Sequence, residues 1–238
     1  MYSAAKMDSL QSVNIQSAQD SVVAAIRDAI FRGELKLGQR LLEKDLSAKF
    51  QISRATVREA LRRLEHVGLI QIRARRGTFV TQLTRGDIER TCRLRAVLEG
   101  LAARYASETM TQEDHSCLEA QVQAMKRAVE DSDPARFLQL DREFHEVIWT
   151  FSGDVQLQYI LRFLSTPYFA FVATLSTFVL TDIRRVWRAH EEYVETLRDK
   201  RPDFVQRKVQ EIHERLAVSV LKDIRRFQKK DSPGPSTF

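Results

Sequence analysis

Apolar residues recur every three or four positions along most of the chain, which is the spacing of amphipathic helices. In the first part, this pattern predicts a helix over residues 17–33 and a short helix over residues 43–50. A third helix is expected to start after Ser53, a good N-cap residue, and to end with Gly68 as its C-cap. Its buried face is predicted to consist of Val57, Ala60, Leu61 and Leu64.

Two short β-prone stretches follow the third helix, over residues 69–73 and 78–83. The basic sequence ARRG separates them, so we expect a β-hairpin with a basic tip. Three helices followed by a hairpin are the layout of a winged helix-turn-helix, in which the last helix reads DNA. The first domain is therefore predicted to span residues 18–84, after a disordered start over residues 1–17.

From residue 87 onward, the pattern predicts helices alone. Their expected ranges are 87–108, 112–131, 134–152, 155–179, 182–200 and 203–228. A capping box at Thr111 and Asp114 and the pair Asp133-Pro134 mark helix starts, and a break is expected near Pro167. The predicted fold class is thus mainly α, an N-terminal winged helix-turn-helix with a small β-hairpin wing followed by an all-α helical bundle. The bundle would span residues 87–228, before a flexible tail over residues 229–238.

The positive charge of the chain is concentrated in its first third. Residues 1–85 hold 15 Lys and Arg against 8 Asp and Glu, whereas the remainder holds 23 against 24. This asymmetry favours a polyanion-binding module joined to a neutral domain. No stretch of the sequence is long and apolar enough to span a membrane. Because the first residues lack the apolar core of a signal peptide, we expect a cytoplasmic protein with Cys92 and Cys117 as free thiols.

Basic side chains lie on the faces of the third helix that its apolar stripe leaves free. They are Arg54, Arg58, Arg62 and Arg63. An arginine fork can pair with guanine edges or phosphate oxygens, and residues at the amino end of a recognition helix reach deepest into the groove. We therefore predict that Arg54, Thr56 and Arg58 contact bases or lie near them. A solvated basic face is the alternative, but Lys44 in the preceding helix and the basic hairpin tip favour DNA.

Polar residues interrupt the apolar faces of three predicted helices in the second domain. Asp141 and His145 share the inner face of one helix, and His190 and His213 lie in line with apolar residues of the last two. A single histidine on such a face is usually a hydrogen-bonded core residue. A buried carboxylate is costly without a cation or several donors, however, and three imidazoles with one carboxylate suit Zn, Ni, Mn or Fe. The pattern alone leaves a core network and a metal site as even alternatives.

The run over residues 26–80, with its blocks SRATVREALRRLEHVGLI and RRGTFV, resembles the DNA-binding domain of the GntR family of bacterial transcription regulators. In that family, the contacts come from a basic residue in the second helix, the residues opening the recognition helix, the Arg of VREAL and the wing tip. The resemblance implies that the DNA-binding residues are Lys44, Arg54, Thr56, Arg58, Arg76 and Gly77.

Residues 87–228 resemble the all-helical effector domain, called FCD, of the FadR-type members of that family. The resemblance rests on RAVLEGLAARYAS, on the Asp-x-x-x-His pair and on the two later histidines. Many members hold a metal beside a pocket for a small organic acid, which implies the metal ligands Asp141, His145, His190 and His213. Arg95 would bind the carboxylate of the effector in a bidentate pair. An ion pair between Arg95 and an acidic neighbour such as Glu99 is the structural alternative.

These features and the resemblance together predict a ligand-responsive transcription regulator that represses and binds a double-stranded inverted-repeat operator. The resemblance alone implies that it binds as a homodimer. Its helical domain would sense a small organic acid next to a divalent Zn, Ni or Mn ion. A metalloenzyme that activates water at the Asp/His site is one alternative, and a non-specific architectural DNA-binding protein is another. We expect no enzyme, because no general base accompanies the predicted ligands. The architectural protein would leave the Asp/His set unexplained.

Overall fold

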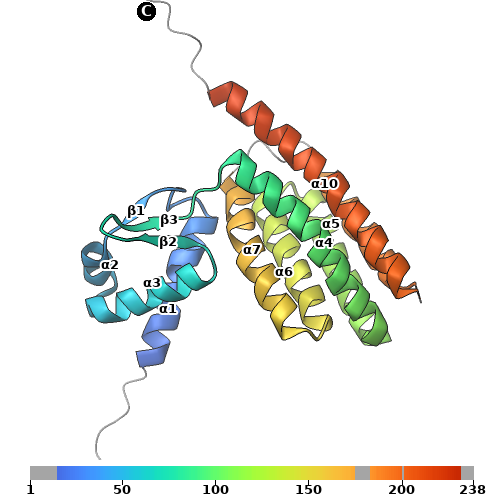
Figure 1. Cartoon of the computed structure of the whole chain (residues 1–238), viewed down its shortest axis with the longest axis horizontal. Helices are drawn as coiled ribbons and strands as arrows, with labels where there is room; N and C mark the ends of the chain where they lie inside the picture. Colours follow the sequence, from blue (N-terminus) through green and yellow to red (C-terminus); the bar gives the residue numbers. More distant parts are fainter. Residues whose placement is uncertain (1–14, 175–182, 200, 232–238) are drawn as a thin grey trace, which may run out of the picture.

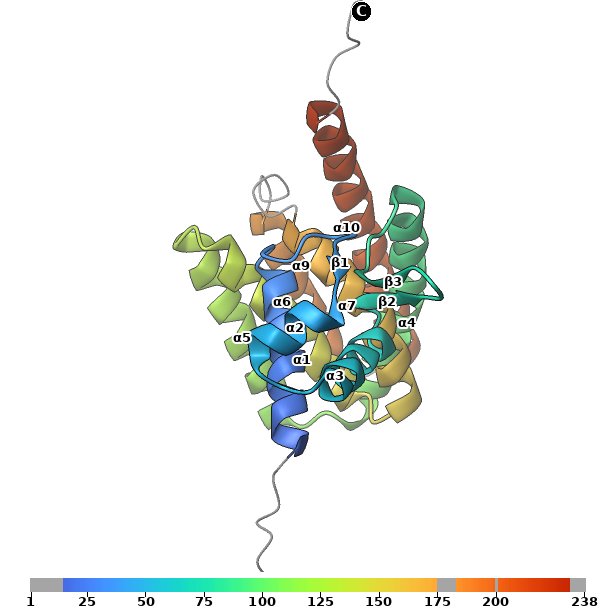
Figure 2. The same cartoon turned by 90° about the vertical axis from the view of Figure 1, so that its left-hand side faces the viewer.

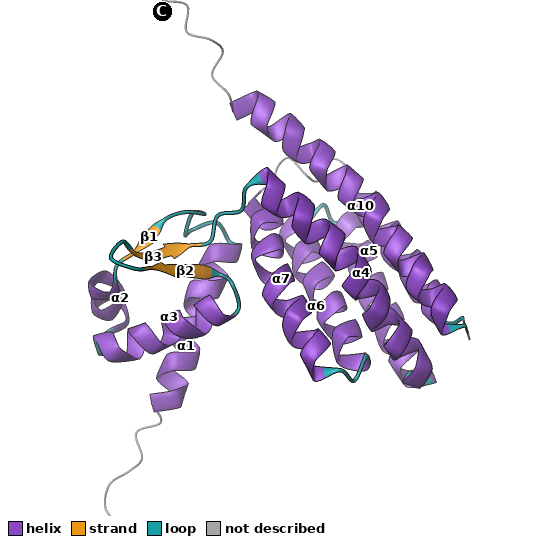
Figure 3. Ribbon diagram, in the orientation of Figure 1, coloured by secondary structure: helices purple, strands orange, loops and turns teal. Residues whose placement is uncertain are grey.

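The computed structural model describes residues 15–174, 183–199 and 201–231. A small module of helices and strands lies beside a bundle of long helices (Figure 1, Figure 3). This arrangement confirms the predicted fold class. Two expected ends are wrong: residues 15–17 already belong to the first helix and residues 229–231 to the last. Neither stretch contains a Gly or Pro that would stop a helix.

The amino-terminal module has the predicted elements in the predicted order, with one strand, β1, in addition. They are α1 (Ile15–Phe31), β1 (Arg40–Leu41), α2 (Glu43–Phe50), α3 (Arg54–His66), β2 (Ile70–Arg73) and β3 (Gly77–Val80). Ser53 caps α3 as expected, since its hydroxyl accepts the backbone N–H of Thr56 at 3.1 Å. Val67, and not Gly68, is the C-cap, and Gly68 follows it with a φ of 75°. A left-handed residue directly after the C-cap is the usual place for glycine.

The wing is a three-stranded antiparallel sheet in the order β1-β3-β2. The hairpin of β2 and β3 is confirmed, with Ile70 opposite Val80. The strand β1 is an addition to the prediction and pairs Arg40 with Phe79. The predicted apolar stripe of α3 is buried and packs with Val22 and Ile26 of α1 in one core.

The bundle consists of helices throughout its described length. They are α4 (Arg85–Thr109), α5 (Gln112–Glu130), α6 (Pro134–Phe151), α7 (Val155–Thr174), α9 (Ile183–Leu197) and α10 (Pro202–Asp231). The capping box of α5 and the Asp133 cap of α6 are present as predicted. The expected break near Pro167 is wrong, because α7 continues through this residue. Burial of Leu161 and Phe169 on either side holds the helix together although Pro167 lacks a donor N–H. The predicted helical residues 175–179 lie outside the described residues.

Helices α4 and α10 pack closely along much of their length (Figure 1). At Gly100 of α4, a Cβ atom would lie 2.7 Å from the backbone oxygen of Gln206 in α10. The two backbones can approach this closely because Gly100 has no side chain. This packing brings the inner faces of the first and last bundle helices together.

Helix α7 joins the bundle to the amino-terminal module. Its residue Ala170 is buried in the core that α1 and α3 form. Next to it, Gly68 meets the backbone of α7, where a Cβ atom would lie 3.2 Å from the carbonyl oxygen of Phe163 and 3.4 Å from the ring of Pro167. Pro167 has no N–H to offer that carbonyl, so Gly68 covers a backbone group that proline has left without its helical donor. None of the described helices has the length and apolar character needed to cross a membrane.

Candidate functional site

Helices α2 and α3 and the turn of the wing lie on the side of the module that Figure 2 presents to the viewer. The side chains of Lys44, Arg54, Arg58 and Arg76 are exposed, and Thr56 and Gly77 are half-buried. The residues predicted to bind DNA thus come from α2, the start of α3 and the wing. Their positions on three elements of one module match what a duplex groove and its flanking phosphates require.

Several of these side chains are held by neighbours. The guanidinium of Arg58 donates from Nε to Glu43 Oε1 at 3.0 Å and from Nη2 to Glu43 Oε2 at 2.7 Å. This hydrogen bond from Arg58 holds the pKa of the Glu43 carboxyl below its usual range. The hydroxyl of Thr56 lies 2.8 Å from that of Ser53. Arg58 is therefore pre-oriented at the surface, with α2 and α3 tied together by one bidentate pair.

The four predicted metal ligands are all buried in the bundle. Asp141 and His145 come from α6, His190 from α9 and His213 from α10. Glu99 of α4 joins them and was missed as a member of this cluster. The ligand atoms fall into two groups, each within 4.8 Å: Asp141, His145 and His190, and Glu99, His145 and His213. The structure therefore gathers the predicted set in one place, with His145 common to both groups.

The first group brings two acceptor atoms face to face. His190 Nδ1 lies 2.8 Å from the backbone oxygen of Val186, which can only accept, so Nδ1 carries the proton. In the neutral ring, Nε2 then keeps a lone pair and lies 2.9 Å from Asp141 Oδ1, and His145 Nε2 lies 3.9 Å from the same oxygen. Within the described part of the chain, His190 Nε2 has no hydrogen-bond partner. A proton or metal cation between these atoms would satisfy them.

Burial and charge act in opposite directions on Asp141. Burial raises the pKa of this carboxyl, but the contact with His190 in its protonated form and the positive charges of His145 and Arg95 outweigh burial and hold the pKa below its usual range. For His213, burial dominates and lowers the pKa of the imidazole to about 3. Its Nε2 also has no hydrogen-bond partner among the described residues. The site thus offers an ionised carboxylate and a neutral imidazole with an unsatisfied nitrogen, which are the forms that bind a metal ion.

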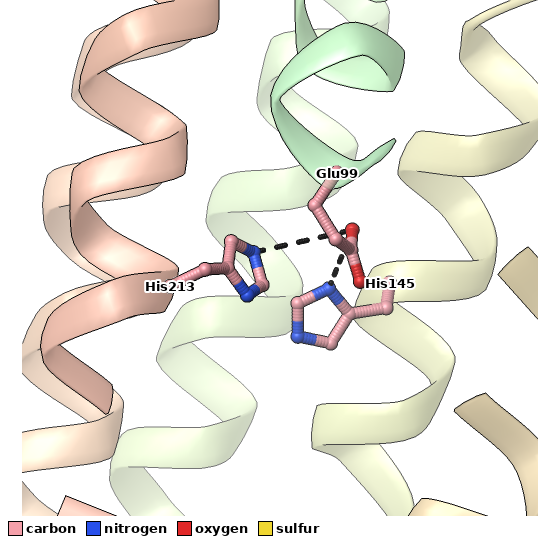
Figure 4. Close-up of side chains that lie close together, drawn as sticks. All are labelled: Glu99, His145 and His213. Carbon is pink, nitrogen blue, oxygen red and sulfur yellow. Dashed lines mark hydrogen bonds and ion pairs between the residues drawn. The ribbon is translucent and has the colours of Figure 1, made fainter. Parts of the chain in front are cut away.

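The second group is centred on Glu99 (Figure 4). Its Oε2 lies 3.3 Å from His145 Nδ1 and 4.0 Å from His213 Nε2. The indole of Trp149 donates to the same oxygen at 2.8 Å, and Arg95 Nη2 donates to Oε1 at 2.8 Å. Burial raises the pKa of Glu99, but the neighbouring imidazoles and Arg95 more than compensate and keep it well below its usual range.

A cavity of about 80 Å³ opens beside this cluster. Asp141, His145, His213 and Arg95 line its polar side, and apolar residues of α6, α7, α9 and α10 form most of the rest. The guanidinium of Arg95 lies 4.7 Å from the ring centroids of both Tyr168 and Phe169. Its Nε lacks a hydrogen-bond partner in the described structure. Arg95 therefore forms the ion pair with Glu99 that was the alternative predicted from the sequence. It also borders the cavity, where it could contact an effector.

The donor set fits a divalent ion. Imidazoles with a carboxylate suit Zn, Ni or Mn, and the unsatisfied nitrogens of His190 and His213 are buried where water would otherwise have to bind them.

The sequence carried one signal for Glu99, its spacing of four residues from Arg95 on a helix, which indicated an ion pair. It carried none for Trp149, because that residue reads as an ordinary core aromatic.

Comparisons with known proteins agree with this architecture. The model of the bacterial regulatory proteins of the gntR family matches residues 18–80, and the model of the FCD domain matches residues 87–215. The Bacillus subtilis (strain 168) HTH-type transcriptional regulator YdhC is 31% identical over 138 residues, 58% of this chain and 62% of that protein. The Escherichia coli (strain K12) HTH-type transcriptional repressor RspR is 31% identical over 142 residues, 60% of this chain and 62% of that protein.

Both matches thus cover less than two thirds of the relatives' own length. A solved structure, E. coli McbR/YncC, shares the fold with a TM-score of 0.74 at 22% identity, over 87% of this chain and 98% of that one. The gntR model describes bacterial regulatory proteins, and both relatives are named as transcriptional regulators and not as enzymes. The chain belongs to the GntR family of bacterial regulatory proteins and carries an FCD domain after its helix-turn-helix.

Proposed function

We propose that this chain is a ligand-responsive, DNA-binding transcription regulator that acts as a repressor on an inverted-repeat operator. The observation that carries the proposal is the presence, in one chain, of an exposed basic recognition face on α3 and a buried Asp/His cluster with its own cavity. The DNA-binding part spans residues 18–84 and the sensing part residues 87–228. The name of the relative RspR, a repressor, supports the direction of control.

Contact with DNA is assigned to Lys44, Arg54, Thr56, Arg58, Arg76 and Gly77. Arg58 is the residue to test, since its fork is already oriented at the surface. We expect Arg58→Ala to weaken binding to an operator selected from random-sequence DNA by about 1–3 kcal/mol in a gel-shift titration. Arg90→Ala is the matched control, because Arg90 is an exposed arginine of α4 paired with Asp87. Equal affinity of both variants would overturn the role of Arg58.

The same titration at increasing salt tests the whole basic surface. Lysine and arginine contacts to phosphates release counterions, so affinity should fall steeply as salt rises. A flat salt dependence would argue against phosphate contacts by this face.

In the sensing part, Asp141, His145, His190 and His213 would hold one divalent ion, Zn, Ni or Mn. The ion would supply a Lewis-acidic site at which an oxygen of a small organic acid can bind, and Arg95 would face the carboxylate of that effector. Binding of the acid would shift the population between two placements of the DNA-binding modules. Paired recognition helices must meet successive major-groove faces, so a small change of placement loses many contacts.

Metal content tests the sensing part. We expect about one equivalent per chain in the untagged protein after incubation with Zn, Ni or Mn. His213→Ala should hold much less, whereas His66→Ala should match the unchanged protein, because His66 lies on α3 against Tyr159. Absence of metal in all three would refute the metal and leave the DNA-binding part standing.

A homodimer completes the proposal. Helices α4 and α7 pack against each other, and each leaves large apolar side chains at the surface. These are Leu94 and Val97 of α4 and Ile160 and Phe163 of α7. A second copy that covers these residues would bring two recognition helices to one operator.

A further inference from the structure

Glu99 is a fully buried carboxylate whose contacts reach well beyond its own helix. Its side chain accepts hydrogen bonds from Arg95 of α4 and Trp149 of α6 and faces His145 of α6. Its backbone oxygen lies 3.4 Å from the hydroxyl of Tyr193 in α9. A buried charge with this many partners has a fixed position, and whatever it contacts is fixed with it.

The contact with His145 determines which nitrogen of that ring carries a proton. The carboxylate beside the Arg95 guanidinium is ionised and can only accept, so the 3.3 Å contact is favourable when His145 Nδ1 carries the hydrogen. In the neutral ring, Nε2 then keeps its lone pair, and Nε2 is the atom that faces Asp141 at 3.9 Å.

The two groups of potential ligands use opposite nitrogens of His145. A site built on Glu99 would take Nδ1, and a site built on Asp141 and His190 would take Nε2. The oxygens of Glu99 already accept from Trp149 at 2.8 Å and Arg95 at 2.8 Å, so Glu99 is satisfied without an ion. The Asp141 carboxylate and Nε2 of the neutral His190 ring instead lie 2.9 Å apart, and Nε2 has no hydrogen-bond partner among the described residues.

We propose that Glu99 is a positioning residue that holds His145 with Nδ1 protonated and thereby presents Nε2 to a divalent ion on the side of Asp141. This role rests on the metal site of the proposed function. The same carboxylate also accepts a hydrogen bond from Arg95, so Glu99 positions both the His145 ring and the guanidinium that borders the cavity. Carboxylates behind metal-bound histidines commonly set ring orientation and metal affinity in this way.

The test combines the tautomer of His145 with metal affinity. Long-range ¹H–¹⁵N NMR of the metal-free protein should show His145 protonated at Nδ1, and Glu99→Gln should change that tautomer population. Competition with a chelator for Zn²⁺ should show about 10- to 100-fold weaker binding by Glu99→Gln. Glu119→Gln is the matched control, because it removes a carboxylate paired with Arg198 outside the cluster. It should leave both readouts unchanged.

Each outcome decides the matter. Protonation of His145 at Nε2 in the unchanged protein would overturn the proposal, even if Glu99→Gln failed to fold. A folded Glu99→Gln variant with the same His145 tautomer would also overturn the proposal. Any loss of Zn²⁺ affinity in that variant would then come from general destabilisation and not from the tautomer. Failure of the unchanged protein to bind Zn²⁺, Ni²⁺ or Mn²⁺ would refute the metal site. In that case, the tautomer would still report whether Glu99 orients His145.

Discussion

At the scale of single residues, the cluster was predictable where polar side chains stand on apolar helical stripes. Asp141, His145, His190 and His213 all satisfy this condition, and all are buried together. Glu99 was foreseen as a partner of Arg95 alone. Its other contacts, to His145 and Trp149, lie 46 and 50 residues further along the chain, and no periodic pattern encodes a pairing at that distance.

Arg95 gives a residue-scale prediction. It is 5% exposed and pairs with the fully buried Glu99, so Arg95→Met leaves an uncompensated carboxylate in the core. We expect a loss of about 3–5 kcal/mol in the free energy of unfolding, measured by urea titration. The double variant with Glu99→Gln should recover part of that loss, since the buried charge is gone. A double variant no more stable than Arg95→Met alone would show that ring packing, not charge pairing, is what Arg95 contributes.

At the scale of elements, the helices were predicted well because their caps and apolar periods are local signals. The failures have nonlocal causes. The strand β1 has two residues and exists because β3 offers it a free edge. The break expected at Pro167 is absent because packing on both sides outweighs the lost hydrogen bond.

The contact of α4 with α10 gives an element-scale prediction. Gly100→Ala should raise helix propensity by about 1 kcal/mol but place a Cβ 2.7 Å from a backbone oxygen that cannot move independently. Overpacking of about 1–3 kcal/mol should dominate and lower the midpoint of thermal unfolding. Gly86→Ala, in the same helix, meets only the flexible end of Arg90 at 3.4 Å and should be neutral or stabilising. Equal melting points for both variants would contradict this account of the close approach.

At the scale of the whole molecule, the uneven charge of the sequence correctly separated the basic amino-terminal module from the bundle. The assembly of two chains was implied by resemblance alone, because an exposed apolar residue looks the same in sequence as a buried one. The structure supplies the missing distinction by identifying which residues of α4 and α7 remain exposed.

The proposed dimer is tested by charge placed on that surface. Val97 and Ile160 are 49% and 46% exposed, so the double variant Val97→Asp with Ile160→Asp should fold but sediment as a monomer. A buried, unpaired carboxylate at an interface costs several kcal/mol per chain. Val218→Asp, on α10 and 67% exposed, serves as the control and should stay dimeric. A monomeric unchanged protein would refute the dimer. A dimeric double variant would show that the second copy binds at another surface.

Helix α7 has two sets of contacts on one rigid rod. Tyr168 and Val172 border the cavity, while Ala170 and Pro167 contact the amino-terminal module. If such a rod transmits a signal, it must do so in both directions, because thermodynamic linkage is reciprocal. If the effector lowers the affinity of the protein for the operator by some factor, then the bound operator lowers the affinity for the effector by the same factor. The fraction of the protein bound to operator DNA would then change the apparent affinity for the effector, just as the effector changes the affinity for the operator.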